Sequence, residues 1–242
     1  MPPHNKILSV SESPNMQIAI DTSTDIASIA LVQGVEILAE LTWRCEQNHT
    51  TELYPRLDFL IAKSGLEIIS ADCIFVAKGP GSFNGLRVGV SAAKGLAFSL
   101  NIPVIGIGTL ESTAYQHSAT DWPVCAIQGA GREEIAAAIY QNKKRGGWCQ
   151  IKAEHITTVA ALAKVIKEAT VFCGEISPLT AGQIKRLLKA KAVIPAPAAQ
   201  LRRAYYLAEL GQRRREAGDF DDPAALQPIY LRRPPITERK KA

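Results

Sequence analysis

The order of strand-like and helix-like segments constrains the fold of this chain more than any single motif. The first half opens with three apolar segments of strand length that tight turns separate: 16–21, 26–32 and 35–41. Such a run predicts an antiparallel meander. It is followed by segments with the pattern of a helix, a strand, a helix and a strand, after which another helix starts: 49–65, 72–79, 82–100 and 102–108.

The second half repeats this order after a change of composition at Asp121-Trp122-Pro123. Its pattern predicts three strands, a helix at 157–169, a strand, a helix, a strand and a last helix at about 198–216. A β-β-β-α-β-α order that occurs twice predicts an α/β protein with two related lobes, each a mixed β-sheet with flanking helices. This order is typical of the ASKHA superfamily, which includes actin, Hsp70 and the sugar kinases.

The same patterns divide the chain into four expected parts. These are a disordered N-terminal extension at 1–15, an N-terminal lobe at 16–117, a C-terminal lobe at 118–231 that includes the last helix, and a basic tail at 232–242. The composition, 47% hydrophobic and 21% charged, is ordinary for a soluble globular protein. Neither an apolar run of membrane length nor a signal-peptide core occurs in the sequence, so we expect a cytoplasmic protein without a membrane partner.

Residue chemistry gives little support for a metal site or a nucleophile. The five cysteines are widely spaced without a C-x-x-C pair, which indicates neither a disulfide framework nor a zinc ribbon. The four histidines do not pair with one another, with a cysteine or with an acid at metal-ligand spacing. No hydroxyl has an evident paired base, so the sequence predicts neither a metal ligand nor a catalytic residue.

The net charge of +5 is concentrated near the C-terminus. From Arg202 to the end there are ten Lys or Arg and six Asp or Glu. One interpretation is a solvated helix face with a charged tail, and the other is an electrostatic footprint for RNA or an acidic partner.

Two glycine- and hydroxyl-rich turns are the candidate binding elements. IAIDTST (18–24) ends a strand in an acid and hydroxyls, and GPGSFNGLRVG (79–89) opens a helix. Free N–H groups at such turns can hold phosphate, and an aspartate can hold a metal through water. The alternatives are a Ser/Thr turn and a helix cap. The residues concerned are Asp21, Thr22, Ser23, Gly79, Gly81, Ser82 and Gly85.

The helix after the second turn carries a stripe of small residues: Gly85, Gly89, Ala92, Ala93 and Ala97. Two glycines weaken a helix by roughly 1 kcal/mol each relative to alanine, so the close approach they permit must matter. The stripe predicts either tight internal packing or an oligomer surface.

Four segments together resemble one family. They are IAIDTSTDIASIAL, NHTTELYP, GPGSFNGLRVGVSAAKGLA and IPVIGIGTLES, and QPIYLRR near the C-terminus resembles a terminal signature of the same family. The chain is similar to the bacterial TsaB family, the YeaZ-like proteins of the glycoprotease-like ASKHA superfamily. The resemblance implies a part in making threonylcarbamoyladenosine on tRNA. It is specific over about the first 115 residues and weak beyond them.

The resemblance implies a non-catalytic partner of TsaD, the paralogue that transfers the threonylcarbamoyl group to the adenosine next to the anticodon. TsaE, an ATPase, joins that complex, and TsaC makes the activated donor. TsaD-like proteins have an H-M-E-G-H type metal motif where this chain has Thr109-Leu110-Glu111-Ser112-Thr113. Threonine hydroxyls are poor substitutes for imidazole ligands. The isolated chain is therefore expected to need no cofactor, with ATP and a divalent metal in the partner subunits and tRNA met through the complex.

The resemblance also assigns roles to the two turns and to two helices. It makes the seven residues of the two turns a vestigial phosphate loop, with the glycine-rich turn now serving structure and assembly. It implies that the helix from His49 and the helix after Ser82 meet the equivalent pair in TsaD, or a second copy of this chain, through the following residues: Tyr54, Leu57, Asp58, Ile61, Arg87 and Val90.

Two departures and two alternatives accompany this interpretation. Family members often carry threonine at the position of Asn84, and an aspartate common to them is missing from the stretch 129–135. The main alternative is an independent ASKHA enzyme, either an ATP-dependent phosphotransferase or a glycoprotease-like peptidase. A stand-alone RNA-binding module is the other, although the C-terminal tyrosines lack the spacing of an RRM.

Overall fold

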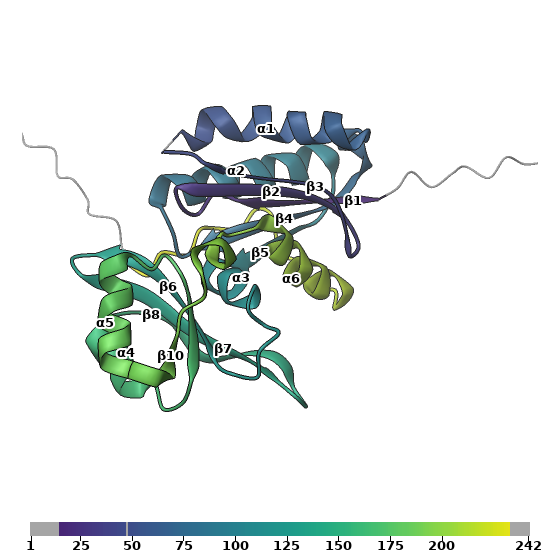
Figure 1. Cartoon of the computed structure of the whole chain (residues 1–242). Helices are drawn as coiled ribbons and strands as arrows, with labels where there is room; N and C mark the ends of the chain where they lie inside the picture. Colours follow the sequence, from purple (N-terminus) through teal and green to yellow (C-terminus); the bar gives the residue numbers. More distant parts are fainter. Residues whose placement is uncertain (1–14, 47, 233–242) are drawn as a thin grey trace, which may run out of the picture.

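The computed structural model describes residues 15–46 and 48–232 (Figure 1). The predicted N-terminal extension, apart from Asn15, and the predicted basic tail, apart from Arg232, lie outside the described residues. Within the described ranges, no helix has both the length and the apolar character needed to cross a bilayer.

The N-terminal lobe is built on a five-stranded mixed sheet in the order β3-β2-β1-β4-β5. Its strands are β1 (Met16–Asp21), β2 (Ile26–Gln33), β3 (Glu36–Arg44), β4 (Ala71–Gly79) and β5 (Val104–Gly108). The first three form the predicted antiparallel meander, and β4 and β5 join β1 in parallel. β1 is buried on both faces because helices cover both sides of the sheet.

Alternate side chains of β1 contact different helices. Ile18 and Ile20 pack beneath α1 (His49–Ser64) and α2 (Phe83–Leu100), whereas Ala19 packs beneath α6 (Ala204–Glu216) on the opposite face. Strand side chains point alternately to the two faces, so one short strand joins both cores. α1 ends at Gly65, which has the left-handed conformation that the sequence predicts for a helix-terminating glycine.

The C-terminal lobe repeats the same topology with the order β10-β9-β6-β7-β8. The strands are β6 (Val124–Gly131), β7 (Glu134–Lys143), β8 (Gly147–Thr157), β9 (Thr170–Gly174) and the short β10 (Ala192–Val193). α4 (Val159–Val165) and α5 (Pro178–Leu188) cover the outer face of this sheet. α3 (Thr109–Tyr115) covers its inner face and also contacts α6. The molecule is therefore layered, with α1 and α2 at one end and α4 and α5 at the other (Figure 1).

Three predicted boundaries are wrong. The last helix begins at Ala204 rather than near 198, because 197–200 form a separate 3-10 turn (Pro197–Gln200) and Ser28 Oγ accepts a hydrogen bond from the backbone N–H of Ala204 at 3.0 Å. The helix predicted at 157–169 covers only Val159–Val165, because Ile166 leaves the helix in an extended conformation and is buried in the C-lobe core.

The third correction concerns the division into lobes. Residues after about 203 belong to the N-terminal lobe, not to a C-terminal lobe that runs to 231, since α6 packs on the sheet of the first lobe. The segment after α6 stays there: Leu226 is buried in the first-lobe core, and the N–H of Ile229 donates to the carbonyl oxygen of Lys78 at 2.6 Å. Only its end reaches across, where Arg232 pairs with Glu134 on β7.

Candidate functional site

The two candidate binding turns lie against each other at one edge of the first sheet. The β1–β2 turn carries Thr22, whose Oγ1 donates to the carbonyl oxygen of Gly85 at 2.7 Å. The N–H of Ser82 donates to the carbonyl oxygen of Ser23, also at 2.7 Å. The structure therefore brings together the residues that the sequence predicts as one site, and it shows that the turns bind each other.

Glycine is required at two of these positions by close packing. A Cβ at Gly81 would overlap the carbonyl oxygen of Ser23, and a Cβ at Gly85 would overlap that of Thr22. At the start of α2, Ser82 Oγ accepts from the N–H of Gly85 at 3.4 Å, which is a long capping bond. The N–H groups of Ser82 and Gly85, which could otherwise bind a phosphate, are thus bonded within the protein.

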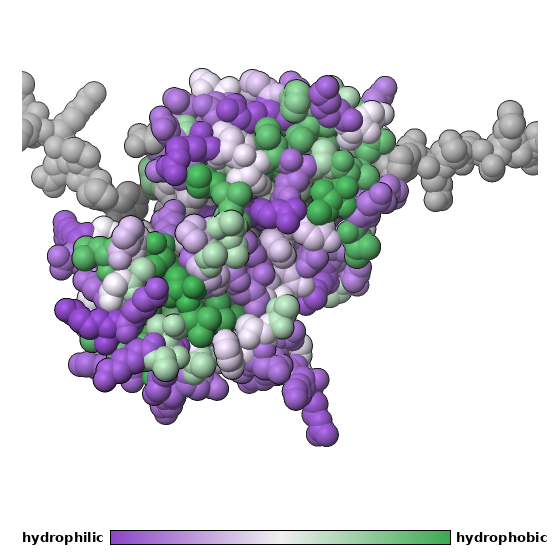
Figure 2. Space-filling model, viewed as in Figure 1, coloured by the Kyte–Doolittle hydropathy of each residue, from purple (hydrophilic) through white to green (hydrophobic). Residues whose placement is uncertain are grey.

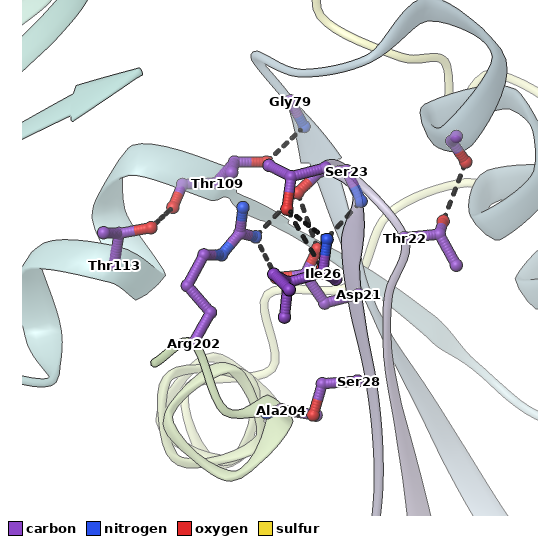
Figure 3. A network of polar contacts seen from close by, with 12 residues as sticks. Asp21, Thr22, Ser23, Ile26, Ser28, Gly79, Thr109, Thr113, Arg202 and Ala204 are labelled. Atoms are coloured by element: carbon purple, nitrogen blue, oxygen red, sulfur yellow. Dashed lines mark hydrogen bonds and ion pairs between the residues drawn. The ribbon is translucent and has the colours of Figure 1, made fainter. Parts of the chain in front are cut away.

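Asp21, at the end of β1, is neutralised by a cation from the far end of the chain. Its carboxylate accepts hydrogen bonds from the N–H of Ser23 at 3.0 Å and the hydroxyl of Ser23 at 2.6 Å, and it forms an ion pair with Arg202. Arg202 also donates to Ser23 Oγ at 2.6 Å. Figure 3 shows the guanidinium reaching this turn from just before α6. Asp21 is 3% exposed and Arg202 is 7% exposed, so this is a buried pair.

This arrangement changes what the aspartate can do. A metal held through water needs a carboxylate that is open to the hydration shell of the ion. Here the carboxylate oxygens are already occupied by Arg202 and Ser23. Sequence reasoning missed Arg202 because 181 positions separate it from Asp21, and no local pattern signals that contact.

The two threonines that stand at the histidine positions of the TsaD-like metal motif bond to the backbone. Thr109 Oγ1 accepts from the N–H of Gly79 at 3.1 Å, and Thr113 Oγ1 donates to the carbonyl oxygen of Thr109 at 2.8 Å (Figure 3). Both side chains are buried. Among the described residues, His, Cys, Asp and Glu form no group of three or more that could hold a metal ion. The arrangement fits a helix start better than a metal centre.

A second polar cluster, which sequence reasoning missed, lines a pocket of about 460 Å³ between the lobes. Its polar side chains come from five elements: Lys78, Glu111, Tyr140, Gln150, Glu154 and Arg214. Burial, and then the negative charge of Glu111, raise the pKa of Glu154 to about 7. Burial also raises the pKa of Glu111. Glu154 can therefore exchange a proton near neutral pH, while Lys78 and Arg214 contact Asp221 at 3.5 and 3.3 Å.

The predicted partner surface on α1 and α2 is only partly available. Tyr54, Asp58 and Arg87 are exposed and Ile61 is half-buried. The inclusion of two other residues is wrong, because Leu57 is 2% exposed and Val90 is 3% exposed, and both pack in the core beneath the helices.

The small-residue stripe likewise faces inward, since all five of its members are buried against the sheet. It therefore serves tight internal packing. The free side of α2 is a different set of residues: Asn84, Arg87, Ser91, Gly95 and Phe98.

Comparison with known proteins decides the family. A family model described as TsaD, tRNA N6-adenosine threonylcarbamoyltransferase, matches residues 40–210. A Bacillus subtilis protein named tRNA threonylcarbamoyladenosine biosynthesis protein TsaB is 32% identical over 218 residues, which cover 89% of this chain and 93% of that protein. The chain belongs to the TsaB family. A Haemophilus influenzae TsaB is 27% identical over 226 residues, 89% of this chain and 92% of that protein.

A solved structure agrees with the fold of this TsaB-family chain. A Pseudomonas aeruginosa protein described as uncharacterized, with similarity to peptidase YEAZ, matches with a TM-score of 0.75. The match covers 90% of this chain and 100% of that chain at 23% sequence identity. The predicted resemblance to the TsaB family and the predicted two-lobed α/β fold of the ASKHA type are both confirmed.

Proposed function

We propose that this TsaB-family chain is a non-catalytic subunit that binds a TsaD-like paralogue. In this role it supports the transfer of the threonylcarbamoyl group to the adenosine next to the anticodon of tRNA. Its relatives are named for threonylcarbamoyladenosine biosynthesis, and the family model that matches 40–210 is that of the transferase. The match to the transferase model indicates that the two proteins share a fold. The proposal depends on the catalytic metal and nucleotide site being absent from this chain.

The observation that carries the proposal is the buried Asp21–Arg202 pair. An arginine that neutralises this carboxylate competes with any divalent cation, and removing it would leave a buried charge without a partner. The hydroxyls of Thr109 and Thr113 are bonded to the backbone where a metal motif would need imidazoles. ATP and a divalent metal are therefore assigned to partner subunits, the TsaD-like paralogue and a TsaE-like ATPase, and tRNA is met through the complex.

The outer layer of α1 and α2 is the surface we assign to the TsaD-like partner. It offers Tyr54, Asp58 and Ile61 on α1, and Arg87 and Phe98 on α2. Aromatic side chains and arginine are enriched at protein interfaces, and Phe98 is 87% exposed. Ser91 and Gly95, on the same side of α2, are small enough for a partner helix to approach closely. Two copies of this chain could pair through the same face when the paralogue is absent.

Charge substitution on this face should weaken partner binding. We expect Phe98→Glu to reduce the affinity for the TsaD-like paralogue about 10-fold or more, because a buried carboxylate would replace an apolar anchor. Calorimetry with the purified paralogue measures the change. Val35→Glu is the matched control, since Val35 is also an exposed apolar residue of the first lobe, in the β2–β3 turn. Equal affinities for Phe98→Glu and the wild type would rule out this surface.

A further inference from the structure

The arginines of the C-terminal fifth do not form a free basic surface in the described residues. Six cations of this region are described: Arg202, Arg203, Arg213, Arg214, Arg215 and Arg232. Five of them are ion-paired with carboxylates. The sixth, Arg213, lies over the ring of Tyr115 at 4.9 Å. In this part of the chain the described cations therefore contact groups within the fold, which gives no support to the electrostatic footprint that was one of the two interpretations.

A cluster of exposed positive charge lies instead on the outer helices of the C-terminal lobe. α4 and α5 contact each other and bury apolar side chains against the sheet. In and directly after these helices, six cations are exposed: Lys164, Lys167, Lys185, Arg186, Lys189 and Lys191. We call them the α4–α5 basic patch. Within the described ranges, none of the six takes part in a salt bridge.

The stretch that contains the patch carries as large a surplus of positive charge as the stretch from Arg202 to the end. Residues 159–191 contain these six cations and two acids, Glu168 and Glu175, a surplus of four in a chain whose net charge is +5. Figure 2 shows hydrophilic side chains projecting from the side of the molecule where Figure 1 places α4 and α5. Lys185 and Arg186 lie in the last turn of α5, and Lys189 and Lys191 follow in a 3-10 turn. Because α4 and α5 contact each other, the six cations gather on one part of the C-terminal lobe.

The composition of the patch favours RNA over an acidic protein as its partner. Protein interfaces are enriched in aromatic residues and depleted in lysine. Five of the six cations here are lysines, and α4 and α5 contain no aromatic residue. Sequence-specific binding of single-stranded RNA needs aromatic stacking, whereas double-helical RNA is contacted mainly at its phosphates. A lysine-rich surface without aromatic side chains therefore fits the phosphate backbone of an RNA helix.

We propose that the α4–α5 basic patch binds the phosphate backbone of the double-helical part of the tRNA substrate. This inference rests on the proposed function for the identity of the RNA. The patch and the α1–α2 surface are at opposite ends of the layered molecule (Figure 1). One chain can therefore hold the TsaD-like paralogue with its first lobe while its second lobe contacts RNA.

The test is the salt dependence of RNA binding by the purified full chain. A fluorescently labelled tRNA transcript is titrated by anisotropy between 20 and 200 mM salt. The test variant is Lys164→Gln/Lys185→Gln/Arg186→Gln. The matched control is Lys143→Gln/Lys144→Gln/Arg145→Gln, which removes three exposed cations from the tip of the β7–β8 hairpin. Thermal melting of both variants verifies that they are folded.

We expect the test variant to lower the slope of log K against log salt by about 2 to 3 and the affinity at 0.1 M salt about 100-fold. The control should bind like the wild type. An unchanged slope for the test variant, an equal loss in the control, or no binding at 20 mM salt would overturn the proposal. Displacement of the RNA by poly-glutamate at equal charge would overturn it in favour of an acidic protein.

This test is independent of the other subunits. If nucleoside modification requires the chain but the test variant binds RNA normally, the proposed function is supported and the RNA-binding role of the patch is contradicted. If the variant loses RNA binding but modification proceeds without the chain, the RNA-binding role is supported and its assignment to this pathway is contradicted.

Discussion

Arg202→Ala is expected to lower the free energy of unfolding by about 3 to 5 kcal/mol, which for many domains is enough to prevent folding at 37 °C. The substitution leaves Asp21 as a buried carboxylate that has lost its cation, although Ser23 still donates two hydrogen bonds to it. Removing one partner of a buried ion pair costs far more than the pair itself contributes. Urea denaturation followed by circular dichroism measures the change.

A second substitution separates the lost charge partner from lost packing. Asp21→Asn in the Arg202→Ala background removes the orphaned charge, so it should recover a large part of the lost stability. Arg203→Ala is the matched control: Arg203 is the adjacent arginine and pairs with Glu40, but the pair is more exposed. It should cost about 1 kcal/mol or less. If Arg202→Ala and Arg203→Ala have the same small effect, the Asp21–Arg202 pair does not hold this turn closed.

Gly85→Ala is expected to lower the free energy of unfolding by about 2 to 3 kcal/mol. The added Cβ would overlap the carbonyl oxygen of Thr22 and would also lie 3.3 Å from Nε2 of His49, so backbone must move to accept it. The loss also includes the hydrogen bond that Thr22 donates to Gly85. The measurement is again denaturant unfolding, with the same probe.

Gly95→Ala, in the same helix, is the control for this prediction. No atom lies within 4 Å of a Cβ at Gly95, and alanine favours a helix by up to about 1 kcal/mol over glycine. Stabilisation by Gly95→Ala together with destabilisation by Gly85→Ala would confirm that the two turns are closed against each other. If Gly85→Ala is as well tolerated as Gly95→Ala, the two turns are not packed as closely as the structure shows.

Most of the fold follows from local patterns in the sequence. The strands of both meanders alternate or are continuously apolar, and each helix has leucines or alanines at helical spacing, so element types and their order are predictable. Ser82 and Gly65 mark helix ends that the structure confirms. The predicted helix boundaries are wrong where tertiary contacts determine the helix ends. Ile166 leaves α4 to be buried, and α6 begins only where Ser28 bonds to Ala204.

The site was less predictable because its decisive contacts join distant parts of the chain. Arg202 contacts Asp21 only because α6 packs on the first lobe. Dividing the sequence into two halves assigns α6 to the second lobe instead. The burial of Leu57 could have been predicted from the sequence. This residue shares its helical spacing with Leu53 and Leu60, so the periodicity that predicts α1 also indicates the side that faces the core. A partner contact at Leu57 conflicts with that pattern.

The central claim is that the chain is required for tRNA modification without being the catalyst. The most direct measurement is an omit-one reconstitution with TsaC, TsaD, TsaE, tRNA, threonine, bicarbonate and ATP, in which threonylcarbamoyladenosine is quantified with and without this chain. We predict strict dependence on the chain, and we predict no product when TsaD is the protein left out. Full modification without this chain, or product formed by this chain without TsaD, would contradict the account.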